Sequence, residues 1–256
     1  MSMRAARNAV AAALAMLIVA GGAYAAEIDA LISTAVKAAT DEIVPPFEKA
    51  TGHKLRAIYG PSGGLTRRFD NGEAADVIIV DSAAIDALIK QGKVAPGRTD
   101  FARTGIGIAV RKGAPKPDVS SAETLKRALL AAKSVGHTAP AGGGITALHI
   151  QRMFERLGIA AEVTPKVKLA AGGPNGRVSV LVSSGEAEIG LQQVSELMSN
   201  PDVEVIGMLP AELQQITIYS AGITAGAKQH EAVKALIEAL AAPSAQPIFK
   251  SKGLAF

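Results

Sequence analysis

A serine and two glycines, Ser62-Gly63-Gly64, stand between a predicted strand and a predicted helix. The first backbone N–H groups of a helix have no partner within it, and the helix dipole adds partial positive charge there. Such an end binds an anion without any cation, and glycine lets a ligand approach the backbone closely. Ser62 would add a hydroxyl donor; its alternative role is a simple helix cap. We therefore expect this turn to contact an anion.

Two further turns repeat this chemistry elsewhere in the chain. Gly143, Gly144 and Thr146 lie in "HTAPAGGGITALHI", between a predicted strand and an amphipathic helix, and Ser33 and Thr34 follow the first predicted strand. The alternative for the triple glycine is a flexible loop or a helix end. Ligands of open α/β sheets bind beyond the carboxyl ends of the strands, where all three turns would lie. We expect the three turns to converge on one site.

Other site chemistries lack necessary parts in this sequence. "PSGG" is not the Gly-x-Ser-x-Gly elbow of a hydrolase, and no Gly-Lys-Ser/Thr phosphate loop is present. "GIGIAV" matches only part of a dinucleotide fingerprint, because no helix follows it. The histidines are scattered and none shows metal-ligand spacing: His53, His137, His149 and His230. We therefore predict a protein without enzyme activity, cofactor or metal.

Short apolar runs alternate with helical stretches along the chain, which predicts an α/β protein. "ADVIIVD" is a continuous apolar run, typical of a strand buried on both faces of a sheet. A helix should follow it, with Ser82 as its cap. After the first apolar segment, strands are predicted at 54–60, 75–81, 104–113, 133–140, 187–193 and 215–224. Helices are predicted at 36–52, 63–72, 82–94, 121–132, 145–158 and 177–185, and in two pieces split near Pro243.

Two alternating strands that look alike, 104–113 and 215–224, enclose a separate α/β series. The simplest arrangement is a discontinuous first lobe, 26–108 plus 219–256, with a second lobe, 109–218, inserted into it. Each lobe would hold a mostly parallel sheet flanked by helices, and two crossing strands would join them. We expect a ligand to bind in the cleft between the lobes and to draw them together by a hinge motion near Gly105–Arg111 and Ile216–Ala221.

Residues 1–25 have the features of a cleavable signal peptide. Arg4 and Arg7 precede an apolar run, and Ala23-Tyr24-Ala25 supplies the small-x-small cleavage pattern. A membrane anchor is less favoured, because the apolar run is shorter than the roughly 20 residues that span a bilayer. The chain contains no cysteine, so neither disulfides nor an attached lipid are expected. We predict a soluble periplasmic monomer.

The charge balance gives no reason to expect a nucleic-acid partner. Lys and Arg number 27 and Asp and Glu number 23. The predicted signal peptide holds two of the arginines and none of the acids, so the mature chain would be nearly neutral. No run of basic residues forms a nucleic-acid patch.

Several motifs together resemble the periplasmic molybdate-binding proteins, the solute receptors of ABC-type importers. They are "YGPSGGL", "NGEAADVIIVDSAAIDALIKQGKV", "GIGIAVRKGAP", "GRVSVLVSSGEAEIGLQQVSEL" and "PIFKSKGLAF", and they extend over nearly the whole mature chain. The resemblance implies a two-lobed type II periplasmic-binding fold that closes on an oxyanion held by hydroxyls and backbone amides. It also implies an ABC permease as partner and no chemistry on the ligand.

The match to the family's site is partial. The family's serine is present as Ser62, whereas its first-turn serine falls near Ala35, beside Ser33 and Thr34. The family's tyrosine is replaced by Gln193, and its Ala-Gly-Arg helix start by the triple glycine. The arginine after "GGPNG" is kept as Arg177. The ligand-binding set predicted from pattern and resemblance is Ser33, Thr34, Ala35, Ser62, Gly63, Gly64, Gly143, Gly144, Thr146, Arg177, Gln192 and Gln193.

These replacements favour an organic ligand. Gln192 and Gln193 can both donate and accept hydrogen bonds, which suits a ligand with mixed groups better than a small tetrahedral dianion. Arg177 could bind one carboxylate bidentately; its alternative is a surface ion pair with Glu186 or Glu188. We predict a receptor for a small anion, with an organic carboxylate ahead of molybdate or tungstate.

Two alternatives stay open at this point. An enzyme on the same fold, such as a dehydratase or lyase of a small carboxylate, would need an acid–base residue in the cleft. His137 and Asp81 are the nearest candidates for that residue, although Asp81 is also a natural helix cap. A ligand-sensing partner of a membrane receptor would have the same fold as a transport receptor.

Overall fold

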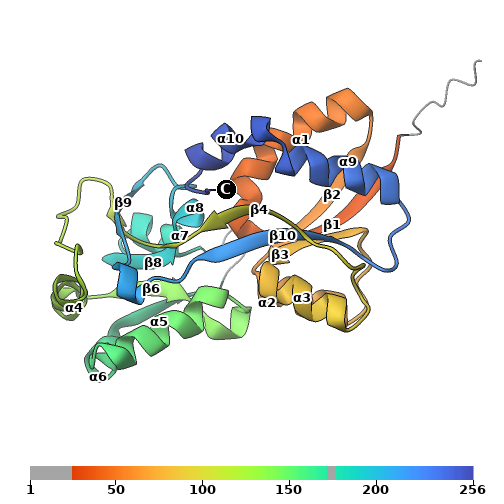
Figure 1. Cartoon of the computed structure of the whole chain (residues 1–256). Coiled ribbons are helices and arrows are strands. Elements are labelled where there is room, and N and C mark those ends of the chain that lie inside the picture. The colour runs from red at the N-terminus through yellow and green to blue at the C-terminus, as the bar shows by residue number, and fades with distance from the viewer. Residues whose placement is uncertain (1–24, 172–176, 256) are drawn as a thin grey trace, which may run out of the picture.

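The computed structural model describes residues 25–171 and 177–255, so the predicted signal peptide lies outside the described residues except for Ala25. Over these ranges the chain forms two five-stranded sheets, each flanked by helices (Figure 1). No helix in this part of the chain combines the length and the apolar character needed to cross a membrane.

The first sheet has the strand order β2-β1-β3-β10-β4. β1 runs parallel to β2 and β3, whereas β10 is antiparallel to both β3 and β4. Helices cover both faces, which explains the apolar run in β3: Val77 and Ile79 pack towards α1 and α9, and Ile78 and Val80 towards α2 and α3. The strands are β1 (Glu27–Ser33), β2 (Lys54–Gly60), β3 (Val77–Asp81), β4 (Thr99–Thr104) and β10 (Thr217–Ile223).

The second sheet repeats this plan with the strand order β7-β6-β8-β5-β9. β6 runs parallel to β7 and β8, and β5 is antiparallel to β8 and β9. Both sheets are therefore mixed, and the prediction of mostly parallel sheets is wrong, because β10 and β5 each run opposite to both of their neighbours. Leu125, Ile150 and Phe154 from α4 and α5 pack on one face, and Val178 and Val182 from α7 on the other. The strands are β5 (Ile106–Arg111), β6 (Val135–Thr138), β7 (Val167–Ala170), β8 (Ile189–Gln193) and β9 (Val203–Met208).

Helices alternate with the strands along the chain, and most of the predicted helix bounds lie within a few residues of the observed ones. The predicted Ser82 cap is wrong: the side chain of Asp81 accepts the Ala84 N–H at 3.0 Å, and Ser82 is the first helical residue. The helices are α1 (Lys37–Thr51), α2 (Ser62–Asp70), α3 (Ser82–Lys90), α4 (Ala122–Ala131), α5 (Ile145–Arg156), α6 (Ala160–Val163), α7 (Val178–Ser184), α8 (Val194–Leu197), α9 (His230–Ala241) and α10 (Gln246–Ser251).

The chain passes between the sheets at two places (Figure 1). Only Gly105 separates β4 from β5, and the segment 209–216 leads back from β9 to β10. A Cβ at Gly105 would lie 2.6 Å from the Met208 methyl group, so a side chain there would require the Met208 side chain to move. β5 pairs only within the second sheet and β10 only within the first. The lobe boundaries at 108/109 and 218/219 stay predictions.

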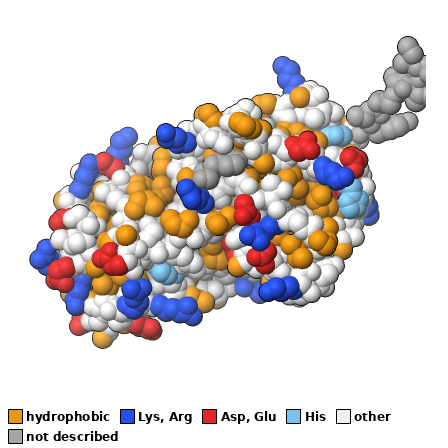
Figure 2. Space-filling view, in the orientation of Figure 1, with side chains coloured by type: hydrophobic (Ala, Val, Ile, Leu, Met, Phe, Trp, Pro, Cys, Tyr) orange, Lys and Arg blue, Asp and Glu red, His pale blue; other side chains and the backbone are white. Residues whose placement is uncertain are grey.

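Charged side chains are mixed over the visible surface. Figure 2 shows lysine, arginine, aspartate and glutamate side chains scattered over both lobes, without a field of one sign. This distribution agrees with the near balance of charges in the sequence. Any anion site must therefore depend on local geometry more than on the overall field.

Candidate functional site: a polar cavity between the two sheets

A small polar cavity lies where strands of both sheets end. β1 ends at Ser33, β6 at Thr138 and β8 at Gln193, and all three residues line it. With the lobes in this contact, the cavity has a volume of only about 20 Å³. Its lining residues are Ser33, Thr34, Pro61, Ser62, Thr138, Gly144, Ile145, Thr146, Gln192, Gln193, Glu196 and Tyr219.

Two longer helices begin at this cavity, one from each side. Pro61 precedes α2 and Gly144 precedes α5; both have extended backbones and neither helix has a side-chain cap. The first-turn N–H groups of an uncapped helix need another acceptor, and the dipoles favour a negative one. The arrangement therefore offers backbone donors to an anion from both lobes.

Hydroxyl groups from the first lobe face the same space. Ser33 and Ser62 are buried residues, with 2% and 3% of their surface exposed. The Ser62 O–H donates to Ser33 Oγ at 3.4 Å, and Ser33 Oγ accepts the Ala35 N–H at 3.4 Å. These are long, weak hydrogen bonds, so both hydroxyls can rotate to donate to a ligand.

The second lobe contributes two buried amides at the end of β8. The Tyr219 O–H donates to Gln193 Oε1 at 2.5 Å, which leaves the Gln193 amide nitrogen for another acceptor. Gln192 Oε1 accepts the Val178 N–H at 3.2 Å. Burial of Tyr219 raises its pKa well above the ordinary value, so the phenol stays a neutral donor at neutral pH.

Glu196 is the one acidic residue of the lining. The Thr34 O–H donates to Glu196 Oε1 at 3.0 Å, which connects the two lobes. Burial raises the pKa of the Glu196 carboxyl, whereas the hydrogen bond from Thr34, the positive charge of Arg177 and the Gln192 amide act in the opposite direction. No lysine, arginine or histidine belongs to the described lining. An anion held here would be bound by neutral dipoles.

Seven of the predicted ligand-binding residues line this cavity, and five do not. Three of the five, Gly63, Gly64 and Gly143, form a direct contact between the lobes beside it. The Gly63 N–H donates to the Gly143 carbonyl at 3.1 Å, and Arg67 donates to the Ala141 carbonyl at 3.1 Å. A Cβ on Gly143 would lie 2.5 Å from the Gly64 nitrogen. These glycines allow the two backbones to touch.

The other two residues lie behind the lining. Ala35 is buried in the core of the first lobe. Arg177 donates to Ser199 Oγ at 2.7 Å, while the expected partners are engaged elsewhere: Glu188 accepts the Lys133 N–H and Glu186 accepts the Ser184 hydroxyl. The Nε of Arg177 is buried without a partner. The positive charge of Arg177 nonetheless lowers the pKa of the Glu196 carboxyl in the lining.

Five lining residues were missed from the sequence: Pro61, Thr138, Ile145, Glu196 and Tyr219. Thr138 could have been found, because it lies near the carboxyl end of the predicted strand 133–140 and ends β6. Tyr219 is distant in sequence from the other lining residues. It contributes a phenol to the cavity, although Gln193 stands where the resemblance to the molybdate-binding proteins implies a tyrosine. Neither acid–base candidate reaches the cavity: His137 bonds to the Thr138 carbonyl, and Asp81 caps α3.

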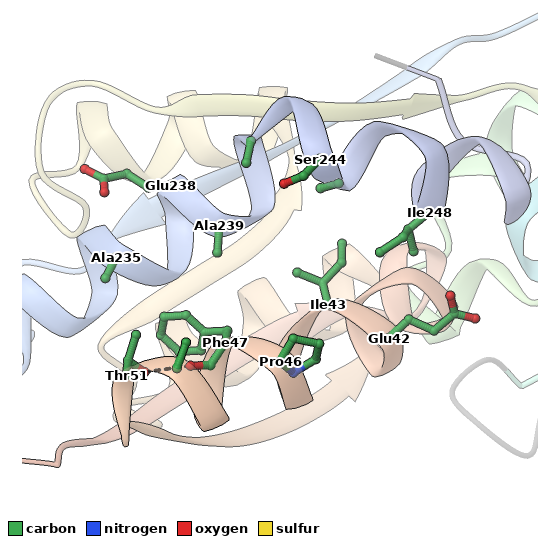
Figure 3. A pocket seen from close by; sticks show the side chains of 13 residues that line it. Glu42, Ile43, Pro46, Phe47, Thr51, Ala235, Glu238, Ala239, Ser244 and Ile248 are labelled. Atoms are coloured by element: carbon green, nitrogen blue, oxygen red, sulfur yellow. Dashed lines mark hydrogen bonds between the residues drawn. The ribbon is translucent and has the colours of Figure 1, made fainter.

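A larger open groove lies on the first lobe, away from the strand ends. It runs between α1 and the α9–α10 segment and has a volume of about 550 Å³ (Figure 3). Ile43, Phe47 and Ile248 line it together with several alanines, while Glu42 and Glu238 stand at its two ends. All of its lining comes from one lobe and most of it is apolar, so this groove lacks the polar donors from both lobes that line the cavity.

Comparison with known proteins agrees with this geometry. The sequence model of the family described as bacterial extracellular solute-binding protein matches residues 28–255. An aconitate isomerase from Pseudomonas sp is 35% identical over 83% of this chain and 81% of its own length. The molybdate-binding protein ModA of Azotobacter vinelandii is 28% identical over 94% of both chains. The solved periplasmic molybdate-binding protein of that species has a TM-score of 0.73 at 19% identity and covers 90% of this chain and 99% of its own, so the two-lobed binding-protein fold is shared.

Proposed function

Because this chain belongs to the bacterial extracellular solute-binding proteins, we propose that it is a receptor that captures a small organic polycarboxylate. The observation that carries this proposal is the polar cavity itself. Hydroxyls, amides and two uncapped helix ends converge on it from both lobes. A ligand bound there would hold the lobes together, and the closed form would be recognised by an ABC permease.

The donor set favours a polycarboxylate over molybdate or tungstate. Buried carboxamides and a protonatable carboxyl, Glu196, can match the separate groups of an organic acid. The relative named aconitate isomerase is more similar in sequence than the molybdate-binding relative, at 35% against 28% identity. We also propose that the receptor works as a monomer in the periplasm after removal of residues 1–25.

A thermal-shift screen tests the ligand class. We expect cis-aconitate, trans-aconitate or citrate at millimolar concentration to raise the unfolding temperature, because a ligand that binds only the native state stabilises it. At 100 times its dissociation constant, a ligand adds about 2.7 kcal/mol. Stabilisation by molybdate with no response to any of the three acids would refute the polycarboxylate proposal.

Replacing Ser62 with alanine should weaken polycarboxylate binding. A buried hydrogen bond to a charged group contributes roughly 1.5–3 kcal/mol, so we expect a loss of about 10- to 150-fold in affinity by calorimetry. Ser251→Ala is the matched control, because this serine is exposed on α10. Equal affinities for the two variants would remove Ser62 from the ligand contacts.

The second candidate function is isomerisation of a bound unsaturated acid, and Glu196 is the observation that favours it. Conversion between cis- and trans-aconitate requires temporary loss of the carbon–carbon double bond. Removal of a proton from the neighbouring methylene, a shift of the double bond and protonation of the far alkene carbon would achieve this. The Glu196 carboxyl could carry the proton. NMR of trans-aconitate incubated with the protein decides: unchanged ligand supports the receptor, and appearance of the cis isomer supports the enzyme.

A further inference from the structure

Glu196 poses an electrostatic problem for a site that takes an anion. Its carboxyl lines the cavity and receives the Thr34 hydroxyl at 3.0 Å. None of the ion pairs among the described residues includes it. Two carboxylates that share a buried site cannot both stay ionised without a large cost, and one of them takes up a proton. A polycarboxylate beside Glu196 creates this situation.

The surroundings of α8 contain few groups that could offset the repulsion. η1 (Thr34–Val36), β8 and α7 carry no titratable side chain, and from β10 the buried phenol of Tyr219 faces Glu196. Arg177, beside α7, is the cation that acts on Glu196, and its NH1 is bound to Ser199.

The two strands packed on α8 add titratable groups only at a distance. Arg111 lies four residues along β5 from Gly107, which touches α8. Glu204 of β9 pairs with Lys116. Neither residue belongs to the cavity lining.

We propose that Glu196 is the proton-carrying residue of the site: it is neutral in the complex and donates its O–H to a ligand carboxylate. The protein then takes up one proton with each polycarboxylate that it binds. This inference rests on the proposed function and adds a mode of recognition to it, an acid–carboxylate pair in place of a salt bridge. The Thr34 hydroxyl holds the Glu196 carboxyl in place from the other lobe, so the pair forms only when the lobes are closed.

The sign of the pH dependence follows from the proton uptake. In the open form that the proposed hinge motion gives the free protein, water reaches Glu196, whose ordinary pKa lies far below neutral, so the carboxyl has lost its proton above neutral pH. Binding then requires one proton from solution, so affinity falls as pH rises. One proton corresponds to a tenfold change in the dissociation constant per pH unit. Trans-aconitate is itself fully ionised in this range, so its own titration does not contribute.

Calorimetry with trans-aconitate between pH 7.5 and 9 tests this inference. We expect the wild-type dissociation constant to rise about tenfold per pH unit, and the binding heats in phosphate and Tris at one pH to differ by the difference between the two buffers' ionisation enthalpies for one proton. Glu196→Gln keeps the size of the side chain and an acceptor for Thr34. The affinity of Glu196→Gln for trans-aconitate should not change between pH 7.5 and 9, and its binding heats should not depend on the buffer.

The outcomes separate the two proposals. Trans-aconitate binding by the wild type without proton uptake, or the same pH slope in both proteins, would overturn the role of Glu196 and leave the receptor intact. Failure of the wild type to bind any of the three acids of the thermal-shift screen would overturn the polycarboxylate receptor, and the proton-carrying role with it.

Discussion

Gly143→Ala should weaken polycarboxylate binding by roughly 30- to 150-fold. The Gly143 carbonyl accepts the Gly63 N–H from the opposite lobe, and a Cβ on Gly143 would lie 2.5 Å from the Gly64 nitrogen and 2.7 Å from the Gly63 carbonyl carbon. Backbone atoms cannot rotate aside as a flexible side chain can, so the lobes would stay apart. A loss of about 2–3 kcal/mol, from one hydrogen bond and incomplete closure, corresponds to this change.

Gly158→Ala is the matched control for this experiment. Both glycines belong to the second lobe and have positive φ, 77° at Gly143 and 66° at Gly158, so both alanines carry a similar backbone cost. A Cβ on Gly158 would meet nothing within 4 Å. Calorimetry should show wild-type affinity for Gly158→Ala only, and small-angle scattering should show ligand-induced compaction for that variant but not for Gly143→Ala. Equal affinities would mean that closure does not need this contact.

The interior of the fold was predictable because buried strands carry a strong apolar signal. The runs that form β3 and β8 are completely or almost completely apolar up to their polar ends, and both lie in the middle of a sheet. The missed strands β4, β7 and β9 all lie at sheet edges, where one side of the strand meets solvent or a loop. Polar residues are tolerated there, as in the "TDFART" of β4, so the apolar pattern is lost.

The site was only partly predictable because its two halves meet through tertiary contacts. Ser33, Ser62 and Gly144 follow predicted strands, so topology alone brings them to one edge. The position of Tyr219 depends on the pairing of β10 with β3, which no local pattern encodes. The glycines are also ambiguous in the sequence. A glycine that contacts a ligand cannot be distinguished there from one that contacts the opposite lobe, because both positions require the absence of a side chain.

Gln193→Glu should weaken polycarboxylate binding by at least about 100-fold at pH 7.5. The substitution keeps the shape of the side chain, and the Tyr219 O–H can still donate to the new carboxylate in place of Gln193 Oε1. It changes the remaining nitrogen, a donor, into a negatively charged acceptor. Two like charges about 4 Å apart repel by about 4 kcal/mol at the effective dielectric constant of a protein surface. Repulsion between the new carboxylate and one charged group of the ligand is therefore enough for the expected loss of affinity.

Gln246→Glu adds the same charge at an exposed position on α10 and should bind as the wild type does, which separates local repulsion from a change in net charge. Lowering the pH should partly restore binding by Gln193→Glu. Burial beside Glu196 raises the pKa of the introduced carboxyl, so it becomes neutral and regains a donor as the pH falls towards 5. Wild-type affinity of Gln193→Glu at pH 7.5 would mean that the negative groups of the ligand lie away from the end of β8. The backbone N–H groups at the starts of α2 and α5 would then be the donors that hold them.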